Sequence, residues 1–170
     1  MGNEEVYEKS FSGSDRTVTV DVKEAGTLVL EVDGVREVIN VRDFLSVDDC
    51  DVPKAFAENP SLYAYYASVH VWYEHLQEKL TYDLSLLKAE KDKVVRKKYS
   101  QMGEKPREGE IHNEVALDPT IQKMEEQLLR AHYVCKKLQI FVRGLERRGD
   151  KLVQRYAAYR RDEERSNSLK

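Results

Sequence analysis

The sequence predicts an α+β protein, in which a small N-terminal antiparallel β-meander precedes a long α-helical hairpin and a short C-terminal helix. Three observations indicate this fold class. Apolar and polar residues alternate before residue 42, apolar residues recur every three or four positions after residue 61, and 35% of the 170 residues are charged. That charged fraction exceeds the roughly 25% of an average globular protein and is typical of long solvated helices. We expect an acidic β-rich module with a connector over residues 1–58, and a helical region over 59–170.

Three β-strands are expected in the first part of the chain. Residues 17–22 alternate with a period of two, and residues 27–32 form a second β-rich run. Asp33-Gly34 then precedes a third run over residues 35–41, and this dipeptide is a strong hairpin signal. Three short strands bury only one face, so the meander is expected to pack on another part of the chain. Residues 42–58 are expected to form a connector with one helical turn.

Two long helices are expected after this connector. Asn59-Pro60 combines an N-cap residue with proline at the first helical position, which predicts a helix start. An apolar stripe follows for about 40 residues, and Gly103 predicts that this helix ends near residue 100. Residues 101–117 are expected to be a long polar connection. Asp118-Pro119 repeats the start signal for the second helix.

The second long helix carries a heptad seam. Eight apolar residues recur at alternating intervals of three and four, namely Ile121, Met124, Leu128, Ala131, Cys135, Leu138, Val142 and Leu145. This pattern is typical of supercoiled helix pairing. The residues predicted to form a helix or subunit interface are Leu128, Leu138, Val142 and Leu145. Leu129, Ile140 and Phe141 add apolar surface off the seam, so self-association is expected. Gly149 is expected to end this helix, and Asp150 to cap a short last one.

Several function classes are excluded. No run approaches the roughly 18 apolar residues of a membrane span, and the start MGNEEVYEKS is unlike a secretory signal. Cys50 and Cys135 lie far apart in sequence, so neither a disulfide nor a zinc site is expected, and the cytoplasm is the expected compartment. His70 and His75 are five positions apart and cannot share a metal on one helix face. Nucleotide-binding and nucleophile motifs are missing, so no enzyme activity and no cofactor are expected.

Charge is distributed unevenly along the chain. Residues 1–58 hold 6 basic and 14 acidic side chains, whereas residues 59–170 hold 22 basic and 17 acidic ones. The first basic cluster lies near the end of the first long helix and consists of Lys88, Lys91, Lys93, Arg96, Lys97 and Lys98. The second basic cluster consists of Arg143, Arg147, Arg148, Lys151, Arg155, Arg160 and Arg161.

Clustered cations favour binding to a phosphate backbone, because they release condensed counterions. The first cluster has more cations than a helix C-terminus needs to complement its dipole. Tyr99, which follows it, offers a ring on which an unstacked base can rest. The predicted DNA-binding residues are Lys88, Lys91, Arg96, Lys97, Lys98, Tyr99, Arg147, Arg148, Lys151 and Arg155. A second interpretation also fits, in which the basic runs are solvated helix faces that complement the acidic N-terminal part.

The order of features in the helical part resembles a known family. An aromatic-rich stretch around Val69, Trp72 and Tyr73 is followed by Leu86-Leu87-Lys88-Ala89-Glu90-Lys91 and then by Val95-Arg96-Lys97-Lys98-Tyr99. Asn113-Glu114-Val115-Ala116-Leu117-Asp118 enters the next helix, and Leu145-Glu146-Arg147-Arg148-Gly149-Asp150 forms a closing turn. Over residues 62–161 this pattern resembles the bacteriophage recombination mediator proteins of the UvsY type.

The resemblance implies a small, helical homo-oligomer that acts in DNA recombination and repair. Such a protein binds single-stranded DNA and helps to load a RecA-like recombinase onto strands covered by single-strand binding protein. The resemblance assigns DNA contact to Arg96 and Lys98, and it implies the host cytoplasm for a phage-encoded chain. An alternative hypothesis is a non-enzymatic coiled-coil structural or assembly protein, a scaffold or adaptor, that does not bind DNA.

Overall fold

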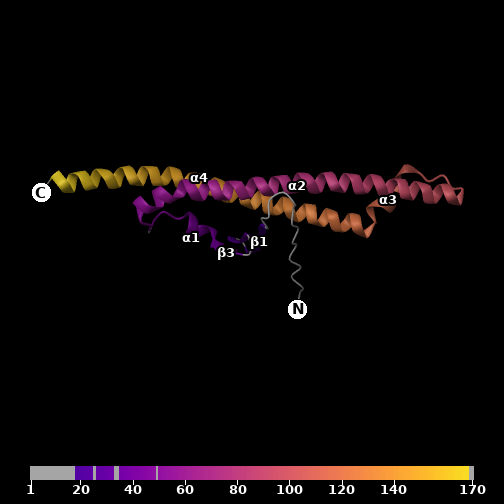
Figure 1. Ribbon diagram of the computed structural model, residues 1–170, viewed down its shortest axis with the longest axis horizontal. Helices are drawn as coiled ribbons and strands as arrows, with labels where there is room; N and C mark the ends of the chain where they lie inside the picture. Colours follow the sequence, from indigo (N-terminus) through magenta and orange to yellow (C-terminus); the bar gives the residue numbers. More distant parts are fainter. Residues whose placement is uncertain (1–17, 25, 33–34, 49, 169–170) are drawn as a thin grey trace, which may run out of the picture. The chain divides into compact units, whose positions relative to one another are not determined.

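A computed structural model gives the structure of the chain and describes residues 18–24, 26–32, 35–48 and 50–168. Within these residues, three β-strands come first and four helices follow, which confirms the α+β class (Figure 1). The chain divides into two compact units. The first unit is Met1–His70 with Lys137–Lys170, and the second unit is Val71–Lys136. None of the helices in the described ranges has the length and apolar character that a membrane span requires.

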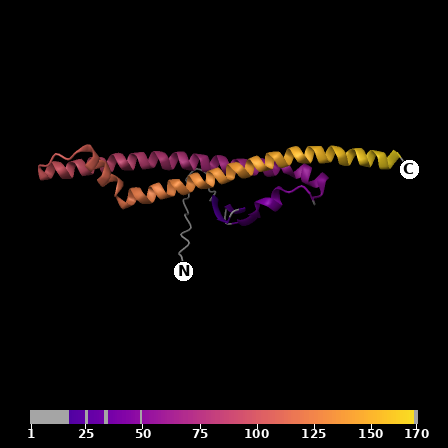
Figure 2. The same cartoon turned by 180° about the vertical axis from the view of Figure 1, so that it is seen from behind.

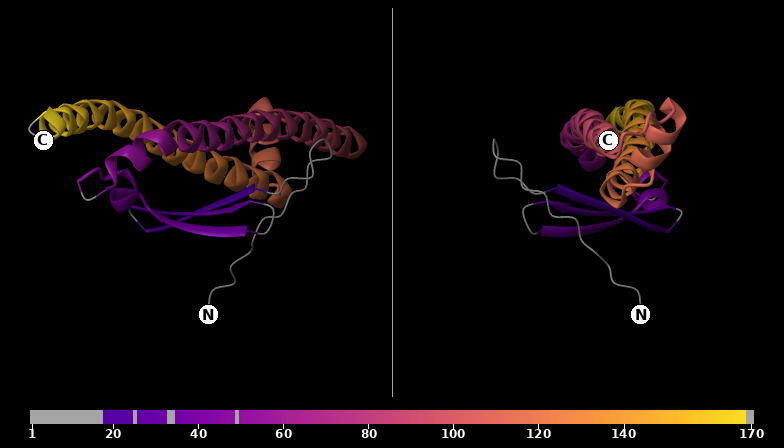
Figure 3. Two further views of the ribbon diagram at one scale, coloured as in Figure 1. Left: turned by 60° about the vertical axis from the view of Figure 1, so that its left-hand side comes forward. Right: turned by 90° about the vertical axis from the view of Figure 1, so that its right-hand side faces the viewer.

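The predicted β-meander is confirmed. Its strands are β1 (Val18–Glu24), β2 (Thr27–Val32) and β3 (Val35–Asn40). They form one antiparallel sheet in the order β1-β2-β3 (Figure 3). Gly26 turns the chain before β2 at a φ of 106°, a conformation that costs glycine no steric strain. The predicted hairpin turn at Asp33-Gly34 lies outside the described residues.

An aromatic cluster joins the sheet to the helices of the first unit. Phe44 in α1 (Val41–Leu45), Tyr66 and Phe141 pack with ring centroids between 4.9 and 5.9 Å apart. The Tyr66 hydroxyl donates a hydrogen bond to Glu37 Oε2 on β3 at 3.2 Å. Burial, followed by the Glu37 carboxylate, raises the pKa of Tyr66, so the phenol stays a donor. Phe141 was expected to be exposed, and this expectation is wrong because Phe44 and Tyr66 cover it.

Helix α2 (Val52–Met102) begins before the predicted start at Asn59-Pro60, so that prediction is wrong. Asp51 caps the helix instead, because its Oδ1 accepts a hydrogen bond from the Lys54 backbone N–H at 3.2 Å. Pro60 therefore lies inside the helix, where a proline costs roughly 3 kcal/mol. Tertiary contacts of the neighbouring Asn59 help to offset this cost. Asp51, followed by Pro53 in the first helical turn, is the sequence signal that locates the helix start.

Asn59 is buried against α4 (Pro119–Ser168). Its Nδ2 donates to the Leu145 carbonyl oxygen at 3.3 Å, and its Oδ1 accepts from Arg148 Nη1 at 2.7 Å. A Cβ built at Gly149 would lie 2.9 Å from Asn59 Nδ2, closer than real side chains approach. Gly149 thus makes room for Asn59, and α4 continues through it without a break. The predicted helix end at Gly149 and the short helix capped by Asp150 are therefore wrong.

The second unit contains a short helix where a plain polar connection was expected. After Gly103, α3 (Glu108–Ala116) lies between the end of α2 and the start of α4 (Figure 2). Ile111 and Val115 face inward from α3 and are 1% and 8% exposed. The core that they join consists of Leu84, Val95, Ile111, Val115 and Ile121. Ile111 and Val115 are four positions apart, so both lie on the side of α3 that packs against this core.

The predicted helix start at Asp118-Pro119 is confirmed, and the residues of the heptad seam are buried or half-buried in both units. Asp118 Oδ1 accepts a hydrogen bond from the Thr120 backbone N–H at 2.9 Å, as an N-cap does. In the second unit, Ile121 is buried and Leu128 packs partly buried against the same core. Seam residues of the first unit are buried at Leu138 and Leu145 and half-buried at Val142. The seam therefore serves packing inside the chain.

The close approach of Asn59 to Gly149 predicts opposite effects of one substitution in two backgrounds. In the parent chain, Gly149→Ala displaces Asn59 from two hydrogen bonds, and a buried polar group left unsatisfied costs about 1–3 kcal/mol. In an Asn59→Ala chain, the same change adds about 0.5–1 kcal/mol of helix stability. Urea unfolding measures both free energies.

The matched control is Gly109→Ala in α3, where a Cβ meets no atom within 4 Å. This change should stabilise both backgrounds equally. Equal effects of Gly149→Ala in both backgrounds would contradict the assignment of Gly149 as a close-approach residue.

Candidate nucleic-acid interface

The first basic cluster lies in the second unit, and four of its six cations form ion pairs. The partners are carboxylates on the same helix or in the segment 108–125 that follows it. Lys88 Nζ lies 2.7 Å from Glu125 Oε1, and Lys91 Nζ lies 2.6 Å from Asp118 Oδ2. The Lys91 ammonium lowers the pKa of the Asp118 carboxyl. These lysines, predicted to contact DNA, are thus neutralised by the chain itself.

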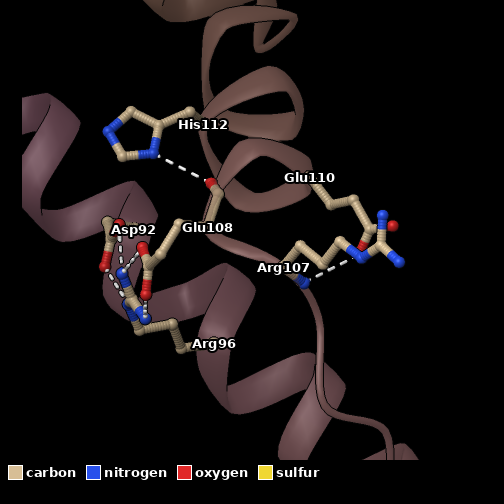
Figure 4. A network of polar contacts seen from close by, with 6 residues as sticks. All are labelled: Asp92, Arg96, Arg107, Glu108, Glu110 and His112. Atoms are coloured by element: carbon tan, nitrogen blue, oxygen red, sulfur yellow. Dashed lines mark hydrogen bonds and ion pairs between the residues drawn. The ribbon is translucent and has the colours of Figure 1, made fainter.

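Arg96 is the centre of a polar network between α2 and α3 (Figure 4). Its Nη2 lies 2.7 Å from Glu108 Oε2, and its Nε donates to Asp92 Oδ1 at 2.6 Å. These hydrogen bonds hold the pKa values of Asp92 and Glu108 below their usual range and raise that of Arg96. His112 Nδ1 bonds the Glu108 carbonyl oxygen at 2.9 Å, which fixes the start of α3 further.

Lys98 and Tyr99 share a partner on α3. Lys98 Nζ lies 2.5 Å from Glu114 Oε1, and the same carboxylate raises the pKa of the Tyr99 phenol. The Tyr99 ring is half-buried and packs against the core of the second unit. In this arrangement the ring serves packing rather than presenting an open face to a base. DNA contact by Arg96, Lys98 and Tyr99 stays a prediction, and each would have to leave an intramolecular partner.

Two cations of the first basic cluster lie outside these pairs. Lys93 and Lys97 are four positions apart, so they project from the same side of α2. Both are exposed, and neither forms an ion pair with any residue that the structure describes. Lys97 was among the predicted DNA-binding residues. Lys93 belonged to the cluster but was not singled out, because its sequence position alone does not distinguish it from its paired neighbours.

Two cations of the second basic cluster hold the first unit together. Arg148 donates to Asn59, as described above. Arg155 Nη2 lies 3.1 Å from Asp48 Oδ1, and its Nη1 donates to the Val47 carbonyl oxygen. Both arginines were predicted to bind DNA. Their guanidinium groups tie α4 to the start of α2 and to the segment that precedes it, and their contact with DNA stays a prediction.

Three other cations of the second basic cluster form what we call the open row, Arg143, Arg147 and Lys151 on α4. They are spaced by four positions, so they lie along one side of the helix over about 12 Å. All three are exposed, and none forms an ion pair within the described part of the chain. The open row contains two of the predicted DNA-binding residues, Arg147 and Lys151, and adds Arg143.

An aromatic stack lies on the first unit near the open row in sequence. Phe56 and Tyr156 are stacked with ring centroids 4.6 Å apart and planes 3° from parallel. Tyr159 continues the series, with its centroid 6.3 Å from that of Tyr156 and a 14° angle between planes. Local periodicity did not indicate this stack, because Phe56 precedes the predicted helix start at Asn59-Pro60. The Asp51 start of α2 would have placed Phe56 on a helix.

Comparisons of the chain with protein-family models, curated proteins and solved structures found no match.

The ion pairs of α3 predict a pH dependence of its packing. Hydrogen bonds from Arg96 and Lys98 lower the pKa values of Glu108 and Glu114 from an ordinary value of 4.5. Their stabilising effect is complete above that ordinary value and is lost as the pH falls through the folded-state pKa values. We expect the methyl NMR signals of Ile111 and Val115 to broaden or shift between about pH 7 and about pH 3.

The control for this prediction is a pair of neutral substitutions at pH 7. Glu114→Gln should reproduce part of the low-pH change, whereas Glu126→Gln, at an exposed position without an ion pair among the described residues, should not. Methyl signals that stay unchanged at low pH would show that the core alone fixes α3.

Proposed function

We propose that this protein is a non-enzymatic recombination mediator that binds single-stranded DNA and helps to load a RecA-like recombinase onto strands covered by single-strand binding protein. The observation that carries the proposal is the open row, Arg143, Arg147 and Lys151. Its three cations are exposed and lack carboxylate partners among the described residues, so a phosphate backbone can neutralise them without breaking an existing ion pair. The resemblance of residues 62–161 to phage recombination mediators supports the same assignment.

The proposed DNA contact is electrostatic and independent of base sequence. Cations bound to phosphates release counterions, and this release supplies most of the affinity of non-specific binding. The open row is the main site, and Lys93 with Lys97 is a smaller one. The paired cations of the first basic cluster contribute less, because each must exchange a carboxylate for a phosphate, which gains little net free energy.

Self-association is part of the proposal. Leu129 is 70% exposed and Ile140 is 64% exposed on α4, so neither side chain is buried by the residues that the structure describes. Apolar contact between copies would bury them and would present several open rows to one strand, which multiplies affinity. Light scattering should give a mass above that of one 19.8 kDa chain. A monomer at all accessible concentrations would remove this part of the proposal.

The partners and the compartment follow from the resemblance and from the charge pattern. The proposed partners are single-stranded DNA, a RecA-like recombinase and single-strand DNA-binding protein. The proposed compartment is the cytoplasm, which is that of the host for a phage-encoded chain.

A structural or assembly role without DNA binding is the second candidate function. The observation that favours it is the pairing of Lys88, Lys91, Arg96 and Lys98 with carboxylates of the same chain. In a scaffold or adaptor, these charges would serve solubility and helix packing only. The two functions differ in one measurable property, salt-sensitive affinity for single strands.

The triple variant Arg143→Ala, Arg147→Ala, Lys151→Ala should bind single-stranded DNA more weakly than the parent. Each lost phosphate contact should flatten the slope of log affinity against log salt by about 0.7, so the triple variant should lose about 2. Alanine at three exposed helix positions opens no cavity and favours the helix, so circular dichroism should stay unchanged. Fluorescence anisotropy of a labelled oligonucleotide at several salt concentrations measures the slope.

The matched control is Lys105→Ala with Lys123→Ala, which removes cations outside both basic clusters and should leave the slope near the parent value. A parent protein without salt-sensitive binding would instead favour the assembly role.

A further inference from the structure

The aromatic stack of the first unit combines ring faces with solvent access. Phe56, Tyr156 and Tyr159 lie nearly parallel, with interplanar angles of 3° and 14°. Phe56 is 36% exposed and Tyr159 is 45% exposed, so both ends of the series keep contact with solvent. An aromatic pair gains most of its stability from burial. Rings that are parallel and still exposed resemble the stacking surfaces on which proteins hold unpaired bases.

The segment of α4 that carries Tyr156 and Tyr159 is rich in cations. Residues 143–161 of α4 hold seven cations and only two acids, Glu146 and Asp150. Tyr156 follows Lys151 of the open row within one and a half helical turns. Toward the C-terminus the charge changes sign at Asp162, Glu163 and Glu164. Arg160 lies on the boundary, with its Nη2 3.7 Å from Glu164 Oε1.

We propose that Phe56, Tyr156 and Tyr159 form a stacking site for the bases of single-stranded DNA whose phosphates contact the open row. This inference rests on the proposed function and deepens it, because it assigns recognition of unpaired bases in addition to charge. The occupant follows from charge complementarity, since a polyanion is attracted to residues 143–161 and repelled beyond them. A duplex keeps its bases stacked on one another and cannot use the rings, so the site selects single strands.

The positions of charges and rings along α4 also set the extent of the proposed site. Phosphates lie on the side of Arg143, Arg147 and Lys151, and the acidic residues 162–164 limit the site at the other end. Tyr159 is the last ring before that limit and the most exposed ring of the three. A base stacked on Tyr159 therefore extends the series that begins at Phe56. Arg155 stays bound to Asp48 and Val47, so it is not assigned to the phosphates.

The test compares oligothymidylate with an abasic oligonucleotide of the same length, which carries the same phosphates without bases. Fluorescence anisotropy measures the affinity of the full-length parent and of Tyr159→Ala for both probes. Tyr159→Ala should bind oligothymidylate about 5- to 100-fold more weakly, since removal of an aromatic ring costs about one base stack. Its affinity for the abasic probe and its salt slope should equal those of the parent, because the ring touches no phosphate.

Three further variants keep the test decisive. Tyr159→Phe retains the ring and should bind as the parent does, and Tyr82→Ala removes a 63% exposed ring of the second unit and should have no effect. Tyr159→Trp should lose fluorescence on addition of oligothymidylate but keep it with the abasic probe.

The possible contrary results separate the two proposals. Equal binding of both probes by the parent, or an unchanged affinity of Tyr159→Ala for oligothymidylate, overturns the stacking site and leaves the proposed function standing. Binding to neither probe overturns the proposed function and the stacking site with it. A change in the light-scattering mass of Tyr159→Ala would assign the ring to a contact between copies and would also overturn the stacking site.

Discussion

Carboxylates of the chain and phosphates of DNA compete for the same cations, and this competition determines which cations are available to a nucleic acid. An ammonium or guanidinium group that already lies within 3 Å of a carboxylate gains little by exchanging it for a phosphate, because both partners are anionic. In the second unit, Arg96 and Lys98 are bound by Glu108 and Glu114 and thereby fix α3. In the first unit, Arg148 and Arg155 stabilise the fold, whereas the open row consists of three other residues. This separation lets the first unit offer charge to a partner without loss of its own contacts.

The continuity of α4 through Gly149 places the open row and the aromatic stack on a single helix of the first unit. Asn59 occupies the space that a side chain at Gly149 would need, and it anchors Arg148 at the same time. Lys151 and Arg155 continue the four-residue spacing of Arg143 and Arg147 along α4. The Lys151 side chain is exposed to solvent, whereas that of Arg155 pairs with Asp48. Close packing on one side of α4 thus decides which of its cations are exposed on the other.

The sequence predicts those features that depend on local periodicity and fails where a distant side chain decides. Alternation with a period of two located the three strands, and the heptad spacing located the buried residues Ile121, Leu138 and Leu145. Asn59 carries the local signal of a helix cap and Gly149 that of a helix end. Each nevertheless lies inside a helix because the other packs against it. The basic clusters are visible in the sequence, but the carboxylate partners of Arg96 and Lys98 lie 12 and 16 positions away on α3. Residue spacing does not show such pairs, so it could not separate open from neutralised cations.

Photochemical cross-linking of single-stranded DNA to the full-length protein shows which of its aromatic residues contact the bases. An oligonucleotide that carries 5-iodouracil forms covalent bonds with aromatic residues that contact its bases, and mass spectrometry of the digested protein locates them. We expect cross-links within residues 143–161, with Tyr159 as the main site, and few within residues 88–99. Cross-links confined to Tyr99 and its neighbours would contradict this expectation, because they would show that DNA displaces the ion pairs of α3 and leaves the open row unused.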